Sequence, residues 1–306
     1  MPGADRIVTI VGPTASGKSS LAVALARLLD GAEIVNADSM QLYRGMDIGT
    51  AKPSAAERAG IPHHLFDVLD VTEPAAVAEF QAWARDAIRA CQARGVTPIV
   101  VGGSALYVRA VLDRLDFPGT DPAVRERWAA ELASRGSAAL HAELASRDPA
   151  AAAQILPSND RRIVRALEVI EVTGRPFAAT MPAHDSVFDN LTMLGLDVPR
   201  DVLDVRLAER VDQMWAAGFV DEVRALRDLG LDDAPTASRA LGYQQILSFL
   251  RGETTEDEAR ESTVAGTRKF ARRQDRLFRK DPRIHWLPYD AEDLVERALA
   301  RLTPQI

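Results

Sequence analysis

Hydrophobic and polar positions alternate in a regular order over the first third of the chain. Short apolar runs predict strands at Ile7–Val11, 33–35 and 97–101, and a run at 65–71 that contains two acids predicts a further one. Between these runs, residues 19–29 and 77–94 place apolar side chains three or four positions apart, as amphipathic helices do. Strands that alternate with helices predict an α/β fold with a parallel sheet flanked by helices.

The pattern changes near residue 118, beyond which only helical signals occur until an apolar run at 191–196. Asp121 followed by Pro122 is typical of a helix start. The chain is then mostly helical again, up to a last strand expected at 285–289. We therefore expect an all-helical insertion domain at 117–189, within a core domain formed by 1–116 and 190–306.

The composition is that of an ordinary folded protein, with 306 residues, 47% hydrophobic and 26% charged. The single cysteine, Cys91, excludes a disulfide framework, a multi-cysteine zinc site and an iron–sulfur cluster, and its position in a helix favours simple packing. His63 and His64 are adjacent and cannot both face one metal from a strand or helix, which favours structural or RNA-contacting roles. No apolar run reaches the ~18 residues of a membrane span, and no secretion signal is evident. We expect a soluble, cytoplasmic monomer that binds no membrane.

Charge is distributed unevenly along the chain. The net charge is −7, yet residues 268–280 contain seven basic residues and one acid, so this stretch carries +6 and the remainder carries −13. If residues 266–280 are helical, the basic residues Lys269, Arg272, Arg273, Arg276 and Lys280 share one face. Such a stripe suits RNA phosphates, and a merely solvated helix would look the same.

A phosphate-binding loop follows the first predicted strand. The segment Gly12-Pro13-Thr14-Ala15-Ser16-Gly17-Lys18-Ser19 matches the pattern G-x-x-x-x-G-K-[ST]. Its glycines let backbone N–H groups point at phosphate oxygens, and the start of the following helix adds positive potential. Lys18 supplies a compact charge, and the Ser19 hydroxyl is a candidate ligand for Mg²⁺. The loop predicts phosphate binding without specifying which phosphorylated compound binds.

Two further segments end predicted strands at the same edge of the sheet. Asp38 follows the second strand, where it could hold Mg²⁺ through water, act as a general base, or simply cap a loop. Gly102-Gly103-Ser104 follows the strand at 97–101, and Ser104 could serve the site or cap the next helix. That strand does not end in an acid, which disfavours a motor or switch NTPase.

Together with these three segments, further motifs make the sequence similar to the tRNA dimethylallyltransferases, also called tRNA isopentenyltransferases. The sequence resembles this family over most of its length. The most specific signature is residues 37–53. The other matching segments, in order, are 12–19, 62–64, 101–107, 159–168, Gly242-Tyr243, 272–274 and 285–287.

This resemblance implies transfer of a dimethylallyl group from dimethylallyl diphosphate to N6 of the adenosine at position 37 of tRNA, immediately 3′ of the anticodon. It implies that the loop grips a diphosphate leaving group, through Gly12, Thr14, Ala15, Ser16, Gly17, Lys18 and Ser19, with Arg224 as a further candidate. Asp38 corresponds to the base that accepts the N6 proton. Ser104 stands where the family usually has Thr and keeps the hydroxyl. Mg²⁺ is the expected cofactor, with Ser19 and Asp38 as its candidate ligands.

The same resemblance implies contacts with the tRNA anticodon stem-loop. The corresponding positions are Asp38, Ser39, Met40, Gln41, Ser104, Arg125, Arg161, Arg162, Ile163, Val164, Arg165, Arg239, Gly242, Tyr243, Gln244, Arg272, Arg273, Gln274, Arg276 and Arg279. One position departs from the family, which commonly has Thr-Trp where this chain has Arg276-Leu277.

Three other functions share some of these features. An ATP-dependent small-molecule kinase would use the phosphate loop and Asp38, but would not explain the basic helix. A nucleotide-switched RNA-binding module would not need Asp38 beside a complete phosphate loop. An enzyme that prenylates free adenine nucleotides would need neither the helical insertion nor the basic helix.

Overall fold

The computed structural model describes residues 5–29, 31–177 and 184–302. It divides into two compact units, one formed by 1–114 and 186–306 and the other by 115–185. The second unit begins two residues before the predicted insertion and ends four residues before its predicted end. None of the helices in the described ranges is long and apolar enough to cross a membrane.

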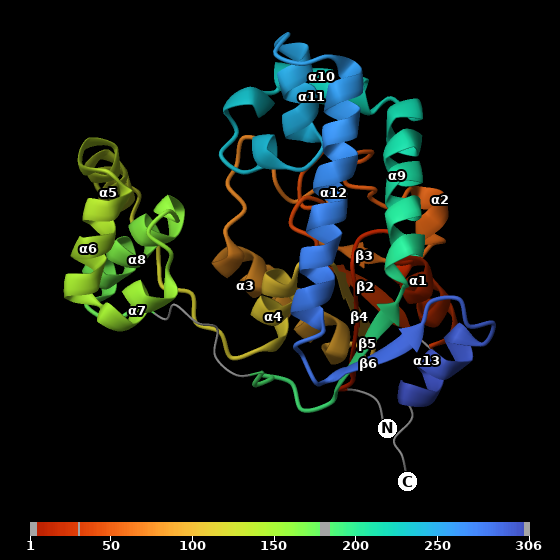
Figure 1. The fold of residues 1–306 in the computed structure, drawn as a ribbon. Helices are drawn as coiled ribbons and strands as arrows, with labels where there is room; N and C mark the ends of the chain where they lie inside the picture. The colour runs from red at the N-terminus through yellow and green to blue at the C-terminus, as the bar shows by residue number, and fades with distance from the viewer. Residues whose placement is uncertain (1–4, 30, 178–183, 303–306) are drawn as a thin grey trace. The chain divides into compact units, whose positions relative to one another are not determined.

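The larger unit is built on a six-stranded sheet in which every neighbouring pair is parallel (Figure 1). The strand order is β3-β2-β4-β1-β5-β6. The strands are β1 (Ile7–Val11), β2 (Ala32–Asn36), β3 (His63–His64), β4 (Thr97–Gly102), β5 (Leu191–Asp197) and β6 (Ile284–Pro288). The predicted fold class, a parallel sheet flanked by helices, is confirmed.

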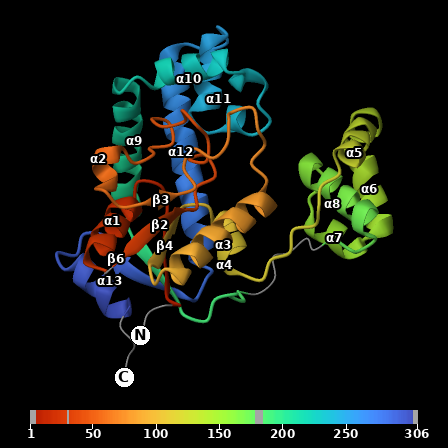
Figure 2. The same ribbon diagram turned by 180° about the vertical axis from the view of Figure 1, so that it is seen from behind.

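Helices cover both faces of this sheet because its strands bury side chains on both sides. Val8 and Ile10 of β1 pack toward α1 (Lys18–Leu28) and α13 (Leu294–Leu302). Ile7 and Val11 of the same strand belong to the opposite core, with α3 (Val77–Ala93) and α4 (Ala105–Leu112) (Figure 2). Because successive side chains of a strand point to opposite faces of the sheet, β1 contributes side chains to both cores.

The remaining helices of this unit follow β5. They are α9 (Arg200–Ala216), α10 (Phe219–Asp228), α11 (Tyr243–Leu250) and α12 (Glu256–Phe278), and the short α2 (Ala55–Arg58) lies earlier in the chain. Two 3₁₀ turns, Leu231–Asp233 and Ala237–Arg239, connect α10 to α11. Helices α9 and α12 run side by side (Figure 1). The predicted basic helix at 266–280 is the last part of the 23-residue α12.

The strand predicted at 65–71 does not form. Leu65 and Asp67 have φ angles of 65° and 58°, in the left-handed region, and an extended strand cannot continue through that backbone. Only Leu69 makes an isolated bridge, to Tyr43, and the edge strand is the two-residue β3 instead. The acids in this segment serve a different purpose, since Asp67 pairs with the buried Lys52 at 2.6 Å.

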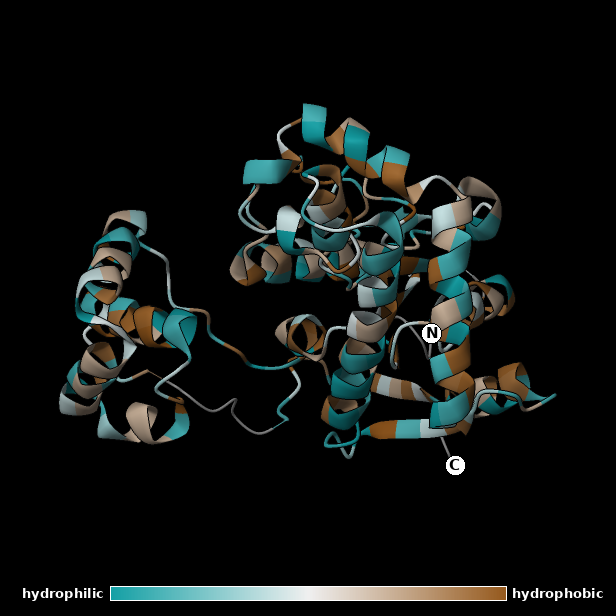
Figure 3. Ribbon diagram, turned by 45° about the horizontal axis from the view of Figure 1, so that its top comes forward, coloured by the Kyte–Doolittle hydropathy of each residue, from teal (hydrophilic) through white to brown (hydrophobic). Residues whose placement is uncertain are grey.

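The smaller unit contains α5 (Pro122–Arg135), α6 (Ser137–Arg147), α7 (Pro149–Gln154) and α8 (Asp160–Thr173) around one apolar core. Each of these helices carries hydrophilic and hydrophobic colours on different sides (Figure 3). Asp121 caps α5 by accepting the N–H groups of Ala123 and Val124, with Pro122 at the first helical position, as the sequence predicts.

Candidate active site

The phosphate loop joins β1 to α1 and is shaped by its backbone. Gly12 and Gly17 have φ angles of 146° and 98°, which side-chain-bearing residues rarely adopt. Lys18 begins α1, and its Nζ donates to the Pro13 carbonyl oxygen at 2.7 Å, across the loop. The loop and the start of a helix therefore present N–H groups and positive potential to the same side.

A cavity of about 1270 Å³ opens beside the loop. Its lining includes many residues predicted from sequence, namely Thr14, Ala15, Gly17, Lys18, Ser19, Asp38, Gln41 and Gln274. Gly12 and Ser16 belong to the loop but do not line the cavity; both are buried. Phosphate-binding and candidate catalytic groups therefore share one space.

Asp38 is held in place at the carboxyl end of β2. Its Oδ1 accepts the Met40 N–H at 3.0 Å, and its own N–H donates to Asn36 Oδ1 at 2.9 Å. Asn36 in turn donates to the Leu65 carbonyl oxygen, which fixes this turn against the following loop. Burial raises the pKa of Asp38, against the opposing influence of the Met40 N–H and Lys18. A carboxylate with a raised pKa is a stronger base than an exposed one.

Lys18 experiences the opposite effect. Burial and, to a lesser extent, the positive charge of Arg210 lower its pKa to about 7, while the negative charge of Asp38 opposes both. An anion that enters the cavity would favour the protonated lysine.

Arg210 is the cavity residue that sequence reasoning missed. It lies on α9, with Nη1 3.5 Å from Thr14 Oγ1 of the phosphate loop. Arg206, Arg210 and Gln213 are spaced at i, i+4 and i+7 and all line the cavity, so a polar stripe on α9 was the available signal.

The family resemblance gave Arg224, in addition to the phosphate loop, as a further candidate for the diphosphate. Arg224 lies on α10, is exposed, and pairs with Asp221 at 2.5 Å, and it does not line the cavity. The structure therefore places Arg210, and not Arg224, with the phosphate loop.

Gln274 joins α12 to the phosphate loop. Its Oε1 accepts the Thr14 N–H at 3.0 Å, although the two residues are 260 positions apart. A Cβ atom on Gly103 would lie 2.6 Å from Gln274 Nε2, so a larger residue there would displace the end of the Gln274 side chain. Gln274 is buried and binds the loop, which differs from its predicted place at the RNA surface.

Ser104 lies beside this contact at the start of α4. It occupies the N-cap position, but its side chain makes no capping hydrogen bond. Ser104 therefore has the position of a cap without its hydrogen bond, and its role in the site stays a prediction. Ser39 and Met40, like Ser104, are partly exposed next to the cavity residues Asp38, Gln41 and Gly103.

Tyr243 and Gly242 have a structural position that the sequence did not predict. Tyr243 is fully buried, and its hydroxyl donates to Glu222 Oε1 at 2.6 Å. The same carboxylate accepts the N–H groups of Asp47, Ile48 and Gly49 at 3.0, 2.6 and 3.1 Å. Tyr243 and Gly242 thus support residues 47–49 of the signature segment 37–53, and both are buried away from any RNA. Gln244 and Arg239 nearby are exposed.

The basic stripe lies on the exposed side of α12. Arg272 is 3.3 Å from Asp204, and Arg279 pairs with Asp197 and Asp275. Within the described residues, Arg273 and Arg276 are exposed and form no ion pair. Lys269 and Lys280 are likewise exposed without an ion pair in the described ranges, so four of the five cations of the predicted stripe are unneutralised.

The predicted RNA-contacting residues of the smaller unit fall into three groups. Arg125 and Arg165 both pair with the fully buried Glu168 at 2.9 Å, while Arg161 and Arg162 are exposed. Ile163 and Val164 are buried in the helical core and are not available to a partner.

The fold and this cavity define a P-loop α/β protein in which the candidate phosphate-binding loop and Asp38 line one cavity. The model of the family described as IPP transferase matches residues 41–281. The chain belongs to this family, as the motifs predict.

The similarity to two known relatives extends over nearly the full length of this chain and of each of these relatives. The chain is 63% identical to the tRNA dimethylallyltransferase of Streptomyces avermitilis, covering 96% of this chain and 94% of the relative. It is also 63% identical to that of Thermobifida fusca, covering 97% and 94%. Among solved structures, the tRNA isopentenylpyrophosphate transferase of Bacillus halodurans has 40% identity, a TM-score of 0.72, and 97% coverage of both chains. A eukaryotic dimethylallyltransferase solved acting on tRNA has 26% identity and a TM-score of 0.82, with 97% of this chain and 78% of that chain covered.

The lowered pKa of Lys18 predicts a proton linked to anion binding. Without divalent cations, Lys18 should take up about 0.9 proton on binding inorganic diphosphate at about pH 8 and about 0.1 at about pH 6, because it is mostly neutral only above its pKa. Calorimetry in buffers of different ionisation heat measures this uptake. Lys18→Arg stays charged, so this variant should lose the proton uptake that comes from the lysine. It should keep the proton uptake that comes from the diphosphate itself. Equal uptake in both proteins would contradict the prediction.

Arg210 and Arg224 give a matched pair for locating the anion site. Arg210→Gln should weaken inorganic diphosphate binding by about 10–100-fold, the effect of a lost charge-assisted hydrogen bond. Arg224→Gln removes the same charge outside the cavity and should change affinity by less than about twofold. A larger loss with Arg224→Gln would restore the assignment made from sequence.

Proposed function

We propose that this chain transfers a dimethylallyl group from dimethylallyl diphosphate to N6 of the adenosine immediately 3′ of the anticodon of tRNA. The observation that carries the proposal is one cavity lined by the phosphate loop, Lys18, Arg210 and Asp38. The cavity combines groups for an anionic leaving group with a base for the nucleophile. The full-length relatives named tRNA dimethylallyltransferase support the same reaction.

The leaving group depends on the phosphate loop. When the bond between C1 of the allyl group and the diphosphate oxygen breaks, its electron pair goes to that oxygen. Loop N–H groups, the protonated Lys18 and the Arg210 guanidinium stabilise the charge that develops there. The Ser104 hydroxyl, free of any capping bond, is proposed to contact the same diphosphate. These groups are arranged before the reaction begins, so no solvent must reorganise.

The nucleophile depends on Asp38. The exocyclic amine of adenine is weakly nucleophilic because its lone pair is delocalised into the ring. As N6 forms its bond to C1, one N6 proton passes to the Asp38 carboxylate, which balances the step. The adenine must leave its stack with neighbouring nucleobases to reach the half-buried Asp38 carboxylate. Nucleobases in loops unstack most readily.

Mg²⁺ is the proposed cofactor, and the residues present fit it. The Ser19 hydroxyl and the Asp38 carboxylate line the same cavity, and hard oxygen donors are what this ion prefers. Ser19 would hold the ion, with Asp38 approaching through water, since a directly bound carboxylate would be a weak base. When bound, the ion would add positive charge near the leaving diphosphate.

The RNA is proposed to bind to α12 and to exposed arginines of the helical unit. Arg273 and Arg276 carry the interaction on α12, because neighbouring acids do not neutralise them. Gln274 lies between them in sequence but faces the phosphate loop, so one helix contacts both substrates under this proposal. A tRNA substrate places the enzyme in the cytoplasm, and a monomer remains a prediction.

Replacement of the proposed base tests the mechanism. Asp38→Asn keeps the size of the side chain and removes its basicity, so turnover should fall by ~10² or more. Binding of tRNA should stay within a few-fold. The measurement is incorporation of labelled dimethylallyl groups into bulk tRNA, with ATP in parallel reactions as the test of a kinase. Near-normal turnover of the variant would refute the assignment of Asp38.

Salt dependence tests the basic stripe. Arg273→Gln combined with Arg276→Gln should weaken tRNA binding and flatten the log–log salt slope by about one to two units, because fewer counterions are released. Arg260→Gln is the control, since Arg260 lies on the same helix and pairs with Asp212 at 2.6 Å. Filter binding over a salt series gives both slopes. A double variant with an unchanged slope would show that the stripe is only a solvated face.

A further inference from the structure

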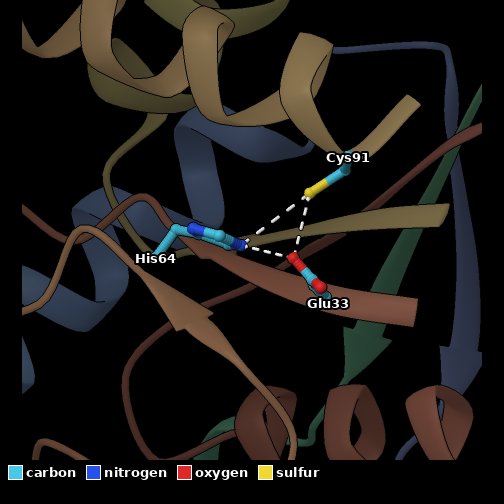
Figure 4. Close-up of side chains that lie close together, drawn as sticks. All are labelled: Glu33, His64 and Cys91. Carbon is cyan, nitrogen blue, oxygen red and sulfur yellow. Dashed lines mark hydrogen bonds and ion pairs between the residues drawn. The ribbon is translucent and has the colours of Figure 1, made fainter. Parts of the chain in front are cut away.

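A second cluster of reactive side chains lies away from the active-site cavity. Glu33 is the second residue of β2, His64 is the last residue of β3, and Cys91 lies in the final turns of α3. None of the three lines the cavity that contains Asp38. Figure 4 shows that the three side chains point toward one another. Cys91 is buried, as the sequence predicts, and the sequence favoured a structural or RNA-contacting role for His64; the approach of the two residues to Glu33 was not predicted.

The three potential ligand atoms converge closely. Glu33 Oε2 is 2.7 Å from His64 Nε2 and 3.4 Å from Cys91 Sγ, and His64 Nε2 is 3.8 Å from Cys91 Sγ. Zinc bonds of about 2.0 Å to nitrogen or oxygen and about 2.3 Å to sulfur, at tetrahedral angles, separate ligand atoms by roughly 3.3–3.6 Å. Two of the three separations lie within a few tenths of an ångström of that range, and the third needs to widen.

Three potential hydrogen-bond donors surround one carboxylate oxygen of this cluster. Glu33 Oε2 faces His64 Nε2, Cys91 Sγ and, at 2.7 Å, Arg94 Nη2, whereas Oε1 faces only Arg94 Nη1 at 2.9 Å. A carboxylate oxygen has two lone pairs, which these three neighbouring groups must share if all of them donate. A metal ion that replaced the imidazole and thiol protons would leave Oε2 with two partners.

We propose that Glu33, His64 and Cys91 form a binding site for Zn²⁺ or a similar borderline-soft divalent cation. A carboxylate, an imidazole and a thiolate are a donor set that suits this ion and not Mg²⁺. The thiol proton is released to solvent on binding, and His64 supplies the Nε2 lone pair with its proton on Nδ1. Two anionic ligands then balance the charge of the ion.

The surroundings supply the remaining parts of such a site. Cys91 is fully buried, whereas the His64 side chain is 31% exposed, so water can reach a fourth position from the histidine side. Arg94 holds the carboxylate of Glu33 from outside, as partners of metal ligands commonly do. The ion would connect α3 to the edge strand β3, which has only two residues to anchor it.

In the absence of a cation, the Cys91 thiol donates to Glu33 Oε2 at 3.4 Å. The competing account, a metal-free hydrogen-bonded cluster, follows from the same contacts and is the alternative outcome of the test.

Cobalt substitution tests the proposal independently of any transferase activity. The full chain, freed of metal by a chelator, should bind one equivalent of Co²⁺ with a thiolate-to-cobalt charge-transfer band and the visible absorption of a tetrahedral ion. Zn²⁺ should displace the cobalt and abolish both signals. Wild-type protein that binds no stoichiometric Co²⁺, or binds it without the thiolate band, would overturn the proposal and leave the hydrogen-bonded cluster.

Variants then assign the ligands. Cys91→Ser should remove the charge-transfer band, and both Cys91→Ser and Glu33→Gln should weaken Zn²⁺ binding by ~100-fold or more. His63→Gln is the matched control, because the His63 Nδ1 contacts the Ile61 carbonyl oxygen and its ring stacks on Phe66, away from the cluster. Far-ultraviolet circular dichroism and diphosphate binding check the fold of each variant. Equal affinity in Cys91→Ser and wild type would exclude Cys91 as a ligand.

Discussion

The close approach of the carboxyl ends of β2 and β4 is the constraint on which the active site depends. A Cβ atom on Gly102 would lie 2.5 Å from the Ala37 carbonyl oxygen, and the Ala37 N–H donates to the Val101 carbonyl oxygen at 2.7 Å. Any larger residue at 102 would push the ends of the two strands apart. Asp38 follows Ala37 directly, so this contact sets where the proposed base lies relative to the phosphate loop.

Among the charged side chains that line the cavity, Lys18, Arg210 and Asp38 influence one another electrostatically in a partly dehydrated space. Lys18 and Arg210 repel each other there, and burial, together with this repulsion, lowers the pKa of Lys18 to about 7. A diphosphate would replace the repulsion with attraction to both groups. The site is therefore electrostatically incomplete without an anion, whereas Asp38, with its raised pKa, is suited to accept a proton.

Helix α12 connects the two proposed binding functions through consecutive residues. Gln274 is buried against the Thr14 N–H, while Arg273 and Arg276 are exposed on other sides of the same helix. Gly103 permits that contact by lacking a side chain. An RNA bound along α12 would therefore lie next to the loop that holds the diphosphate, without a separate element to link them.

The sequence by itself determined the sheet, the phosphate loop, the helical insertion and the family, because these follow from local periodicity and contiguous motifs. It predicted a strand at 65–71 that does not form, since the left-handed backbone at Leu65 and Asp67 is not visible in a hydrophobic pattern. Only the tertiary structure placed Arg210 in the cavity in place of Arg224, turned Tyr243 inward onto Glu222, and brought Glu33, His64 and Cys91 together. These facts depend on which side chains from distant segments meet, and sequence spacing fixes the face of an element but not what packs against it.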